Sequence, residues 1–305
     1  ANGGKFKGTE LVTVLAGAND IFGLTDTLRA AATAAGGQAL ATSLVTQLLA
    51  GVPGPNQAAA QVYIGTAIGT EAANPSATPT TIITAAITAA ATHAALNAYT
   101  NTVDPVANAA TIGATAGAAA VTAGNTYAAT TGAANAVAGM TVAANTLAGY
   151  VTDMVNTKGA THVVVVNLPD VSLTPNANLP ANVANKPLIL AMTTAFNTAL
   201  QTALAGAPGV LLVDAFSENQ RQIANKAQYG LTNVTDVACD LNRPGNLLAT
   251  STTAADGSSL ACNTNNLVAG DTSRYLFADN VHPTPYGHKL LSQYVTNALL
   301  TAGWL

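Results

Sequence analysis

The chain has 305 residues, of which only 8% are charged, and its formal net charge at pH 7 is −4. Soluble domains usually carry about 25% charged residues, so Thr, Asn, Gln, Ser and Gly must supply most of the polar surface here. Phosphate neutralisation needs clustered Lys and Arg, and the sequence has no basic run, which excludes nucleic acid as an expected partner. No apolar run reaches the roughly 18 residues of a membrane-spanning helix, so no transmembrane segment is expected.

The amino-terminal residues 1–5 contain no basic region followed by an apolar one, and therefore do not look like a secretory signal peptide. They lead almost directly into a predicted strand. This is the pattern expected if an original amino terminus had been removed, and it does not argue for the cytoplasm.

Two cysteines, Cys239 and Cys262, lie in the polar region 233–271. They are either two unrelated free thiols or one disulfide. A disulfide would close a loop of 22 intervening residues, and the loop-entropy model gives it about 3 kcal/mol of stabilisation. We favour the disulfide, because the Lys-poor, Thr- and Asn-rich composition fits a secreted or extracytoplasmic protein in an oxidising compartment.

Three short apolar runs are predicted to be buried parallel strands, because they are mostly β-branched and do not alternate with polar residues. They are residues 11–16, 162–168 and 210–214. Stretches with apolar residues at helical spacing are predicted to be helices at 144–158, 186–205 and 285–302. The alternation of strands and helices predicts an α/β layered fold.

Between the first two predicted strands, residues 53–132 consist almost entirely of Ala, Thr, Gly and Asn. Low-complexity disorder is one explanation of such a composition. Residues 57–101, however, carry Ile, Val, Tyr and Leu at spacings compatible with a helix, and Asp104-Pro105 would interrupt it. We expect a helical hairpin of small residues whose helices pack closely.

A polar tetrapeptide, Gly17-Ala18-Asn19-Asp20, directly follows the first predicted strand. In an open parallel sheet, functional groups gather beyond the carboxyl ends of the strands. The side-chain amide of Asn19 is suited to donate a hydrogen bond to an oxyanion. An Asn-Asp pair after a strand is equally typical of a helix cap.

Near the other end of the chain, Asp279 precedes His282 by three positions, just ahead of the last predicted helix. A carboxylate at this spacing is able to accept a hydrogen bond from one imidazole nitrogen and leave the other free to take a proton. This is the general-base half of a nucleophilic hydrolase, and the alternative is an unrelated surface pair at a helix start. His93, His162 and His288 are predicted to be structural, and the sequence has no zinc-binding pattern.

Together these features resemble the SGNH hydrolases, also called the GDSL esterase and lipase family, and especially their bacterial phospholipase-like branch. The resemblance covers most of the chain outside residues 53–132, in the family's order. It rests on residues 17–22, 166–171, 196–197, 214–216, 230–236, Cys239 and 276–283. It implies a three-layer flavodoxin-like fold, of whose about five parallel strands this chain holds three. Residues 1–305 would be the carboxyl-terminal portion of one such domain, with 53–132 a helical insertion.

The resemblance also implies a reaction, which is serine acyl transfer on lipid or short acyl esters followed by hydrolysis of the acyl-enzyme. His282 would be the general base, Asp279 its orienting acid and Asn19 a donor of the oxyanion hole. Gly17 and Asp20 would support the local turn. No metal or organic cofactor is implied.

The nucleophilic serine of the family is missing from its expected place. The family carries it in a Gly-Asp-Ser-Leu-like motif after an earlier strand, and the sixteen residues before Gly17 contain no serine. The segment Asp256-Gly257-Ser258-Ser259-Leu260 looks similar, but it lies between the cysteines with no strand before it. No Gly-x-Ser-x-Gly elbow occurs either.

We therefore expect an amino-terminal fragment of the same precursor, separated by proteolysis, to supply the serine and an oxyanion-hole glycine. Residues 11–16 would otherwise form an unpaired apolar edge, which natural proteins avoid. This chain alone is predicted to be inactive. Two other functions stay open, a non-catalytic binding or assembly module, and an Ala/Thr-rich surface protein in which residues 53–132 are the active part. The joint presence of Asn19, Asp279 and His282 favours the enzyme.

Overall fold

The computed structural model describes residues 3–95, 104–240 and 259–305. The chain forms two compact units. Residues 1–24 and 136–305 make up the first, called the α/β unit, and residues 25–135 make up the second, called the helical unit. The segment Asp256–Leu260, which only superficially resembles a serine motif, lies outside the described residues except for its last two positions.

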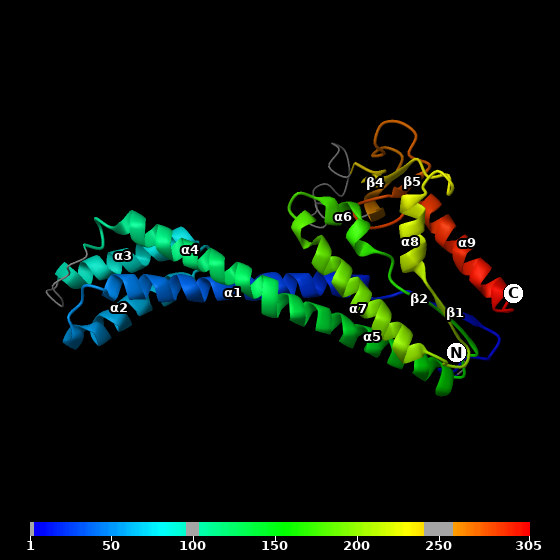
Figure 1. Ribbon diagram of the computed structural model, residues 1–305, viewed down its shortest axis with the longest axis horizontal. Coiled ribbons are helices and arrows are strands. Elements are labelled where there is room, and N and C mark those ends of the chain that lie inside the picture. The colour runs from blue at the N-terminus through cyan, green and yellow to red at the C-terminus, as the bar shows by residue number, and fades with distance from the viewer. Residues whose placement is uncertain (1–2, 96–103, 241–258) are drawn as a thin grey trace. The chain divides into compact units, whose positions relative to one another are not determined.

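The centre of the α/β unit is a parallel sheet which, among the described residues, has three strands in the order β1-β2-β3. The strands are β1 (Leu11–Val14), β2 (His162–Val166) and β3 (Val210–Val213). In the register, Val12 pairs with Val163, and Val164 pairs with Leu211. Val163 and Val164 are fully buried, because β2 is central and covered on both faces. The predicted α/β class with three parallel strands is confirmed, and Figure 1 labels β1 and β2 of this sheet.

Strand β1 lies at the edge of this sheet, and within the described residues it pairs only with β2. Leu11 is 44% exposed, and Leu15, just beyond the strand, is 52% exposed. Edge strands of natural proteins are usually protected by charges, prolines or a covering element. An apolar edge such as this one is suited to pair with a further strand.

Three helices were predicted from the spacing of their apolar residues. They are α5 (Ala133–Asn156), α7 (Lys186–Leu204) and α9 (Pro285–Thr301). Helix α9 packs Leu299 against Val164, Val166 and Val213 of the sheet. Helix α7 buries Phe196 and further side chains one turn apart, so its inward face follows the helical period. The prediction of these helices is confirmed, although α5 begins well before residue 144.

A second parallel pairing, which the sequence did not predict, joins β4 (Asn233–Val237) to β5 (Tyr275–Phe277). Val234 of β4 and Leu276 and Phe277 of β5 form a small core with Leu231. The remaining described elements of the α/β unit are short. They are η2 (Val171–Leu173), α6 (Pro175–Asn178), η3 (Val183–Asn185), α8 (Ala215–Ala224) and η5 (Ser259–Ala261).

The helical unit contains the helices predicted within residues 53–132, with α2 (Gly54–Ala72) and α3 (Pro79–Ala95) in place of the predicted helical hairpin. Its elements are the part of α1 (Ala18–Leu49) from Thr25 onward, α2, α3, α4 (Ala109–Tyr127), a π-helical turn η1 (Ala128–Gly132) and the start of α5. The unit begins before residue 53 because α1 runs into it without a break. Within the described ranges, no helix combines the length and hydrophobicity that crossing a bilayer requires.

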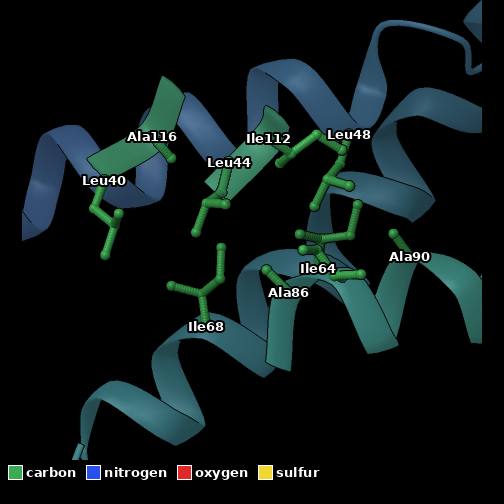
Figure 2. Packing of buried hydrophobic residues seen from close by; sticks show 10 residues of the cluster. Leu40, Leu44, Leu48, Ile64, Ile68, Ala86, Ala90, Ile112 and Ala116 are labelled. Atoms are coloured by element: carbon green, nitrogen blue, oxygen red, sulfur yellow. The ribbon is translucent and has the colours of Figure 1, made fainter. Parts of the chain in front are cut away.

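The core of the helical unit combines Leu and Ile with Ala, and Figure 2 shows these side chains meeting. They are Leu40, Leu44, Leu48, Ile64, Ile68, Ala86, Ala90, Ile112 and Ala116. Helices α1 and α4 approach so closely that a Cβ on Gly36 would lie 3.0 Å from the carbonyl oxygen of Ala120. A small residue at position 36 is thus what allows α1 and α4 to approach.

Candidate active site

Asp279 and His282 lie in the turn between β5 and α9. The Nδ1 atom of His282 is 2.8 Å from Oδ2 of Asp279. The Asp279 side chain is 1% exposed, whereas that of His282 is 60% exposed. The carboxylate thus binds one imidazole nitrogen at the protein interior, and Nε2, on the opposite side of the ring, is left for an incoming group.

Backbone pairing and a helix cap hold this turn. The N–H of Ala278 donates to the carbonyl of His282 over 2.8 Å, which closes the turn around Asp279. The hydroxyl of Thr284 accepts from Gly287 N at 3.1 Å and donates to Tyr275 O at 2.5 Å. Thr284 therefore caps α9 and ties its first turn to β5. The position of His282 is fixed from both sides.

Asp279 accepts four hydrogen bonds from described residues. Its Oδ1 accepts from the backbone N–H groups of Val281 at 2.7 Å and His282 at 2.6 Å. Its Oδ2 accepts from Nδ1 of His282 and from the backbone N–H of Ser259. A carboxylate offers about four lone-pair sites, so the capacity of this buried group is filled. Burial of a carboxylate is tolerated where it is fully hydrogen-bonded.

The Gly17–Asp20 turn follows β1 at the start of α1. Gly17 has a φ of +118°, which side chains rarely adopt, and a Cβ there would lie 2.4 Å from Cζ of Phe196. Only glycine fits this position. The N–H of Asp20 donates to Gly17 O at 3.1 Å, and its carboxylate lies in the first turn of α1, where negative charge is favoured. Asn19 is exposed in the same turn.

A small, mostly apolar pocket of about 290 Å³ opens beside the Gly17–Asp20 turn. Its lining residues are Ala16, Gly17, Asp20, Ala143, Thr146, Leu147, Tyr150 and Phe196. Because it lies just beyond the carboxyl end of β1, it occupies the place where α/β proteins of this kind bind ligands.

Polar residues from three of the segments that resemble the family join the ends of β2 and β3. Asn167 donates to Oδ1 of Asp214 at 3.0 Å and accepts from the N–H of Phe216 at 3.0 Å. Asn197 of α7 donates to and accepts from the backbone of Leu168, each at 2.9 Å. These hydrogen bonds hold the loops that follow β2 and β3.

The carboxyl group of Asp214 also caps α8 by accepting from Ser217 N. Burial opposes its charge, but hydrogen bonds from Ser217 and Asn167 outweigh burial and hold the pKa of Asp214 below its ordinary value. The family-like segment around Asp214 therefore has a structural role.

The structure brings together two of the predicted pairs. Asp279 contacts His282, and Cys239 forms the predicted disulfide with Cys262, with a Cα–Cα distance of 5.8 Å. In the part of the chain that the structure describes, no hydrogen bond joins Asn19 to Asp279 or His282, so its catalytic role stays a prediction. No group of three or more His, Cys, Asp or Glu within the described residues is arranged to hold a metal ion.

The other histidines lie in packing environments or on the surface. His162 contacts Thr161 and meets the Trp304 ring edge-on at 4.8 Å between centroids. His93 meets the Tyr63 ring at 5.0 Å in the helical unit. His288 is exposed on α9.

Sequence reasoning missed the contact of Ser259 with Asp279. The sequence around Ser259 resembles a serine motif, but what Ser259 contributes to the site is its backbone N–H, which donates to Asp279. A backbone N–H that tertiary pairing brings from 20 residues away has no signature in the sequence.

The α/β unit thus combines a parallel sheet with a turn that holds a histidine against a buried carboxylate, an arrangement suited to general-base chemistry. The family model of the GDSL-like lipases and acylhydrolases matches residues 70–295, more than half of the chain, and the protein belongs to this family. The match includes Asp279 and His282 and begins after Gly17–Asp20. No curated protein matches the chain. Membership of an acylhydrolase family indicates ester hydrolase activity.

Proposed function

We propose that the α/β unit is the base-bearing part of a serine ester hydrolase whose nucleophile comes from a segment outside these 305 residues. The observation that carries the proposal is the 2.8 Å contact between Nδ1 of His282 and the buried Asp279, with the His282 ring open to solvent. This contact orients the ring and selects the tautomer in which Nε2 is a base.

The mechanism follows from this orientation. Nε2 of His282 takes the proton of the serine hydroxyl as its oxygen attacks the ester carbonyl carbon. Asp279 stabilises the imidazolium that forms. The same proton is then given to the departing alkoxide, leaving an acyl-serine. His282 then takes a proton from water as the water oxygen attacks the acyl carbon, and gives this proton to the serine oxygen as the acyl–oxygen bond breaks, which releases the carboxylic acid and restores the serine.

Asn19 is the proposed side-chain donor to the oxyanion formed in both steps. Its place after β1, in a turn that Gly17 and Asp20 hold rigid, supports this role. A donor held rigidly in advance stabilises developing charge without reorganisation, and loss of one such donor typically costs about 10²–10³ in kcat.

Within the described residues, β1 pairs on one side only, which supports a serine-bearing segment as its partner. Leu11 and Leu15 are exposed along this edge, and a parallel strand laid against it would cover them. The same strand would end beside the Gly17–Asp20 turn, where a serine at its carboxyl end would be close to the predicted oxyanion donor. We propose that this segment belongs to the same precursor and is separated by processing.

The proposed location is secreted or extracytoplasmic, in a bacterium. The Cys239–Cys262 disulfide and the Lys-poor composition support an oxidising compartment. The proposed substrates are carboxylic esters of lipids or short acyl chains.

Reconstitution tests the proposal. The chain is mixed with, or joined to, the serine-bearing segment of its precursor, and hydrolysis of p-nitrophenyl butyrate is followed. We expect turnover only when both parts are present. A mixture in which both parts are folded and bound but no ester is cleaved would instead favour a non-catalytic binding module.

A further inference from the structure

We infer that the backbone N–H of Ser259, held in place by the Cys239–Cys262 disulfide, positions the His282–Asp279 pair. The structural part of this inference concerns the described residues alone. Its consequence for ester hydrolysis rests on the function proposed above.

Ser259 has a distinct place among the donors to Asp279. Three of the four hydrogen bonds come from Val281 and His282, in the turn that contains Asp279 itself. The fourth comes from Ser259, 20 residues earlier in the sequence, and it reaches Oδ2, the oxygen that also contacts the imidazole. Two donors on one oxygen fix the direction of its lone pairs, so Ser259 restrains the oxygen that orients His282.

A closed chain of contacts holds Ser259 against Asp279. Ser259 starts the short turn η5, in which the N–H of Cys262 donates to Ser259 O at 2.9 Å. Cys262 is bonded to Cys239, whose N–H donates to the carbonyl of Ala278 at 3.0 Å. Ala278 is the residue directly before Asp279. The disulfide therefore connects the turn that contains Ser259 to Ala278, the residue next to Asp279.

The following segment has its own anchors. Val268 N donates to Ala238 O at 2.9 Å, and Asp240 N donates to Asn266 O at 2.7 Å. Residues 266–268 thus stay paired with the end of β4 without help from the disulfide. We expect reduction to release the 259–262 turn locally while the surrounding structure persists.

At position 259, the contact with the pair is made by the backbone and lies on the Nδ1 side of His282. The backbone nitrogen of Ser259 contacts Oδ2, the oxygen on the Nδ1 side of His282. A nucleophile must instead approach Nε2, which lies across the ring. The group that matters at position 259 is therefore the N–H and not the hydroxyl.

Two substitutions distinguish the role of the Ser259 backbone N–H from that of its hydroxyl. The Ser259→Pro variant removes the N–H, and proline is compatible with the first position of a helical turn. The Ser259→Ala variant keeps the N–H and removes the hydroxyl. The pair differs in one hydrogen-bond donor to Asp279.

The readout is the tautomer of the neutral His282 ring, observed through its imidazole ¹⁵N resonances. The chain alone is sufficient, and a His282→Gln variant assigns the signals. We expect the Nδ1–H tautomer in the oxidised protein and in Ser259→Ala. We expect a shift toward the Nε2–H tautomer, which free imidazole side chains prefer in water, in Ser259→Pro and after reduction with dithiothreitol.

A Cys239→Ser/Cys262→Ser variant gives the same test if Ser259→Pro does not fold, with folding checked by circular dichroism. Retention of the Nδ1–H tautomer in a folded protein that lacks the Ser259 N–H or the disulfide would overturn the inference. Loss of this tautomer in Ser259→Ala would also overturn it, because the hydroxyl would then be responsible.

Activity of the reconstituted enzyme is a separate readout. Ser259→Pro should lower kcat by about tenfold or more, and by more than Ser259→Ala does, with little change in KM, because a wrong tautomer removes the base and not substrate binding. The tautomer result does not depend on turnover. If His282 behaves as expected and no ester is cleaved, the proposed function fails while the positioning inference stands.

Discussion

In the α/β unit, the buried positions are filled by Val, Leu, Met and Phe from strands and helices, and buried polar groups such as Asp279 are fully hydrogen-bonded. In the helical unit, Leu and Ile alternate with Ala, and helices meet where glycine leaves room. The two units thus reach a packed core with different side chains.

The two units therefore differ in what a single substitution is expected to change. The His282–Asp279 pair depends on a network of directed hydrogen bonds, so a single lost donor is expected to change chemistry before stability. The core of the helical unit depends on the close fit of apolar atoms, so a change in side-chain volume there is expected to change stability alone. Three substitutions and one chemical treatment test these expectations.

The largest effect is expected at His282. In the reconstituted enzyme, His282→Gln should lower kcat by about 10⁴-fold or more, because the serine loses its base. His288→Gln is the matched control, since His288 is exposed on the neighbouring helix α9. Ester hydrolysis measured under saturating substrate decides the comparison, and similar rates for the two variants would remove His282 from the mechanism.

Truncation of the helical core comes next. Leu44 is fully buried, and Leu44→Ala should destabilise the helical unit by about 3–4 kcal/mol through lost burial and a cavity. Val62→Ala, at a side chain that is 69% exposed, should change stability by less than about 0.5 kcal/mol. Urea unfolding followed by circular dichroism measures both. The His282 tautomer should stay unchanged in Leu44→Ala, and a change would show that the two kinds of packing are coupled.

Reduction of the disulfide should affect the α/β unit. With a sequence separation of 23 between Cys239 and Cys262, the loop-entropy model predicts a loss of about 3 kcal/mol. Thermal unfolding with and without dithiothreitol measures it. The Cys239→Ser/Cys262→Ser variant should be insensitive to the reductant, and a further loss in that variant would point to an effect other than the disulfide.

The smallest effect concerns two neighbouring glycines of α1. A Cβ on Gly36 would lie 3.0 Å from the Ala120 carbonyl oxygen, whereas a Cβ on Gly37 meets nothing within 4 Å. Gly36→Ala should therefore destabilise by about 1–3 kcal/mol, and Gly37→Ala should stabilise by about 0.5–1 kcal/mol. Equal effects in urea unfolding would contradict the close approach of α1 and α4.

The sequence was sufficient to predict the three strands of the main sheet, because β-branched runs such as 162–168 are typical of buried parallel strands. It was insufficient for β4 and β5. The residues of β4, Asn-Val-Thr-Asp-Val, are polar enough to look like a turn, and only pairing with β5 makes them a strand. The length of α1 was also missed, because Gly36 and Gly37 weaken the helical signal and their value appears only in packing.

The candidate site shows the same limit. Asp279 and His282 were predicted as a pair because three positions of one turn bring them together, which is a local property. Cys239 and Cys262 were predicted to bond from their composition and context. The donor at Ser259 depends on the path of the chain between the cysteines, which no local pattern encodes.

The central claim is that these residues supply the base of a serine hydrolase and that the serine lies elsewhere. Covalent labelling with a fluorophosphonate, mapped by mass spectrometry, tests it most directly. We predict that the 305-residue chain alone stays unlabelled, and that the chain with its serine-bearing segment is labelled on the serine of that segment, unless His282 is replaced by Gln. A stable, His282-dependent adduct on a serine within residues 1–305 of the chain alone would contradict the account.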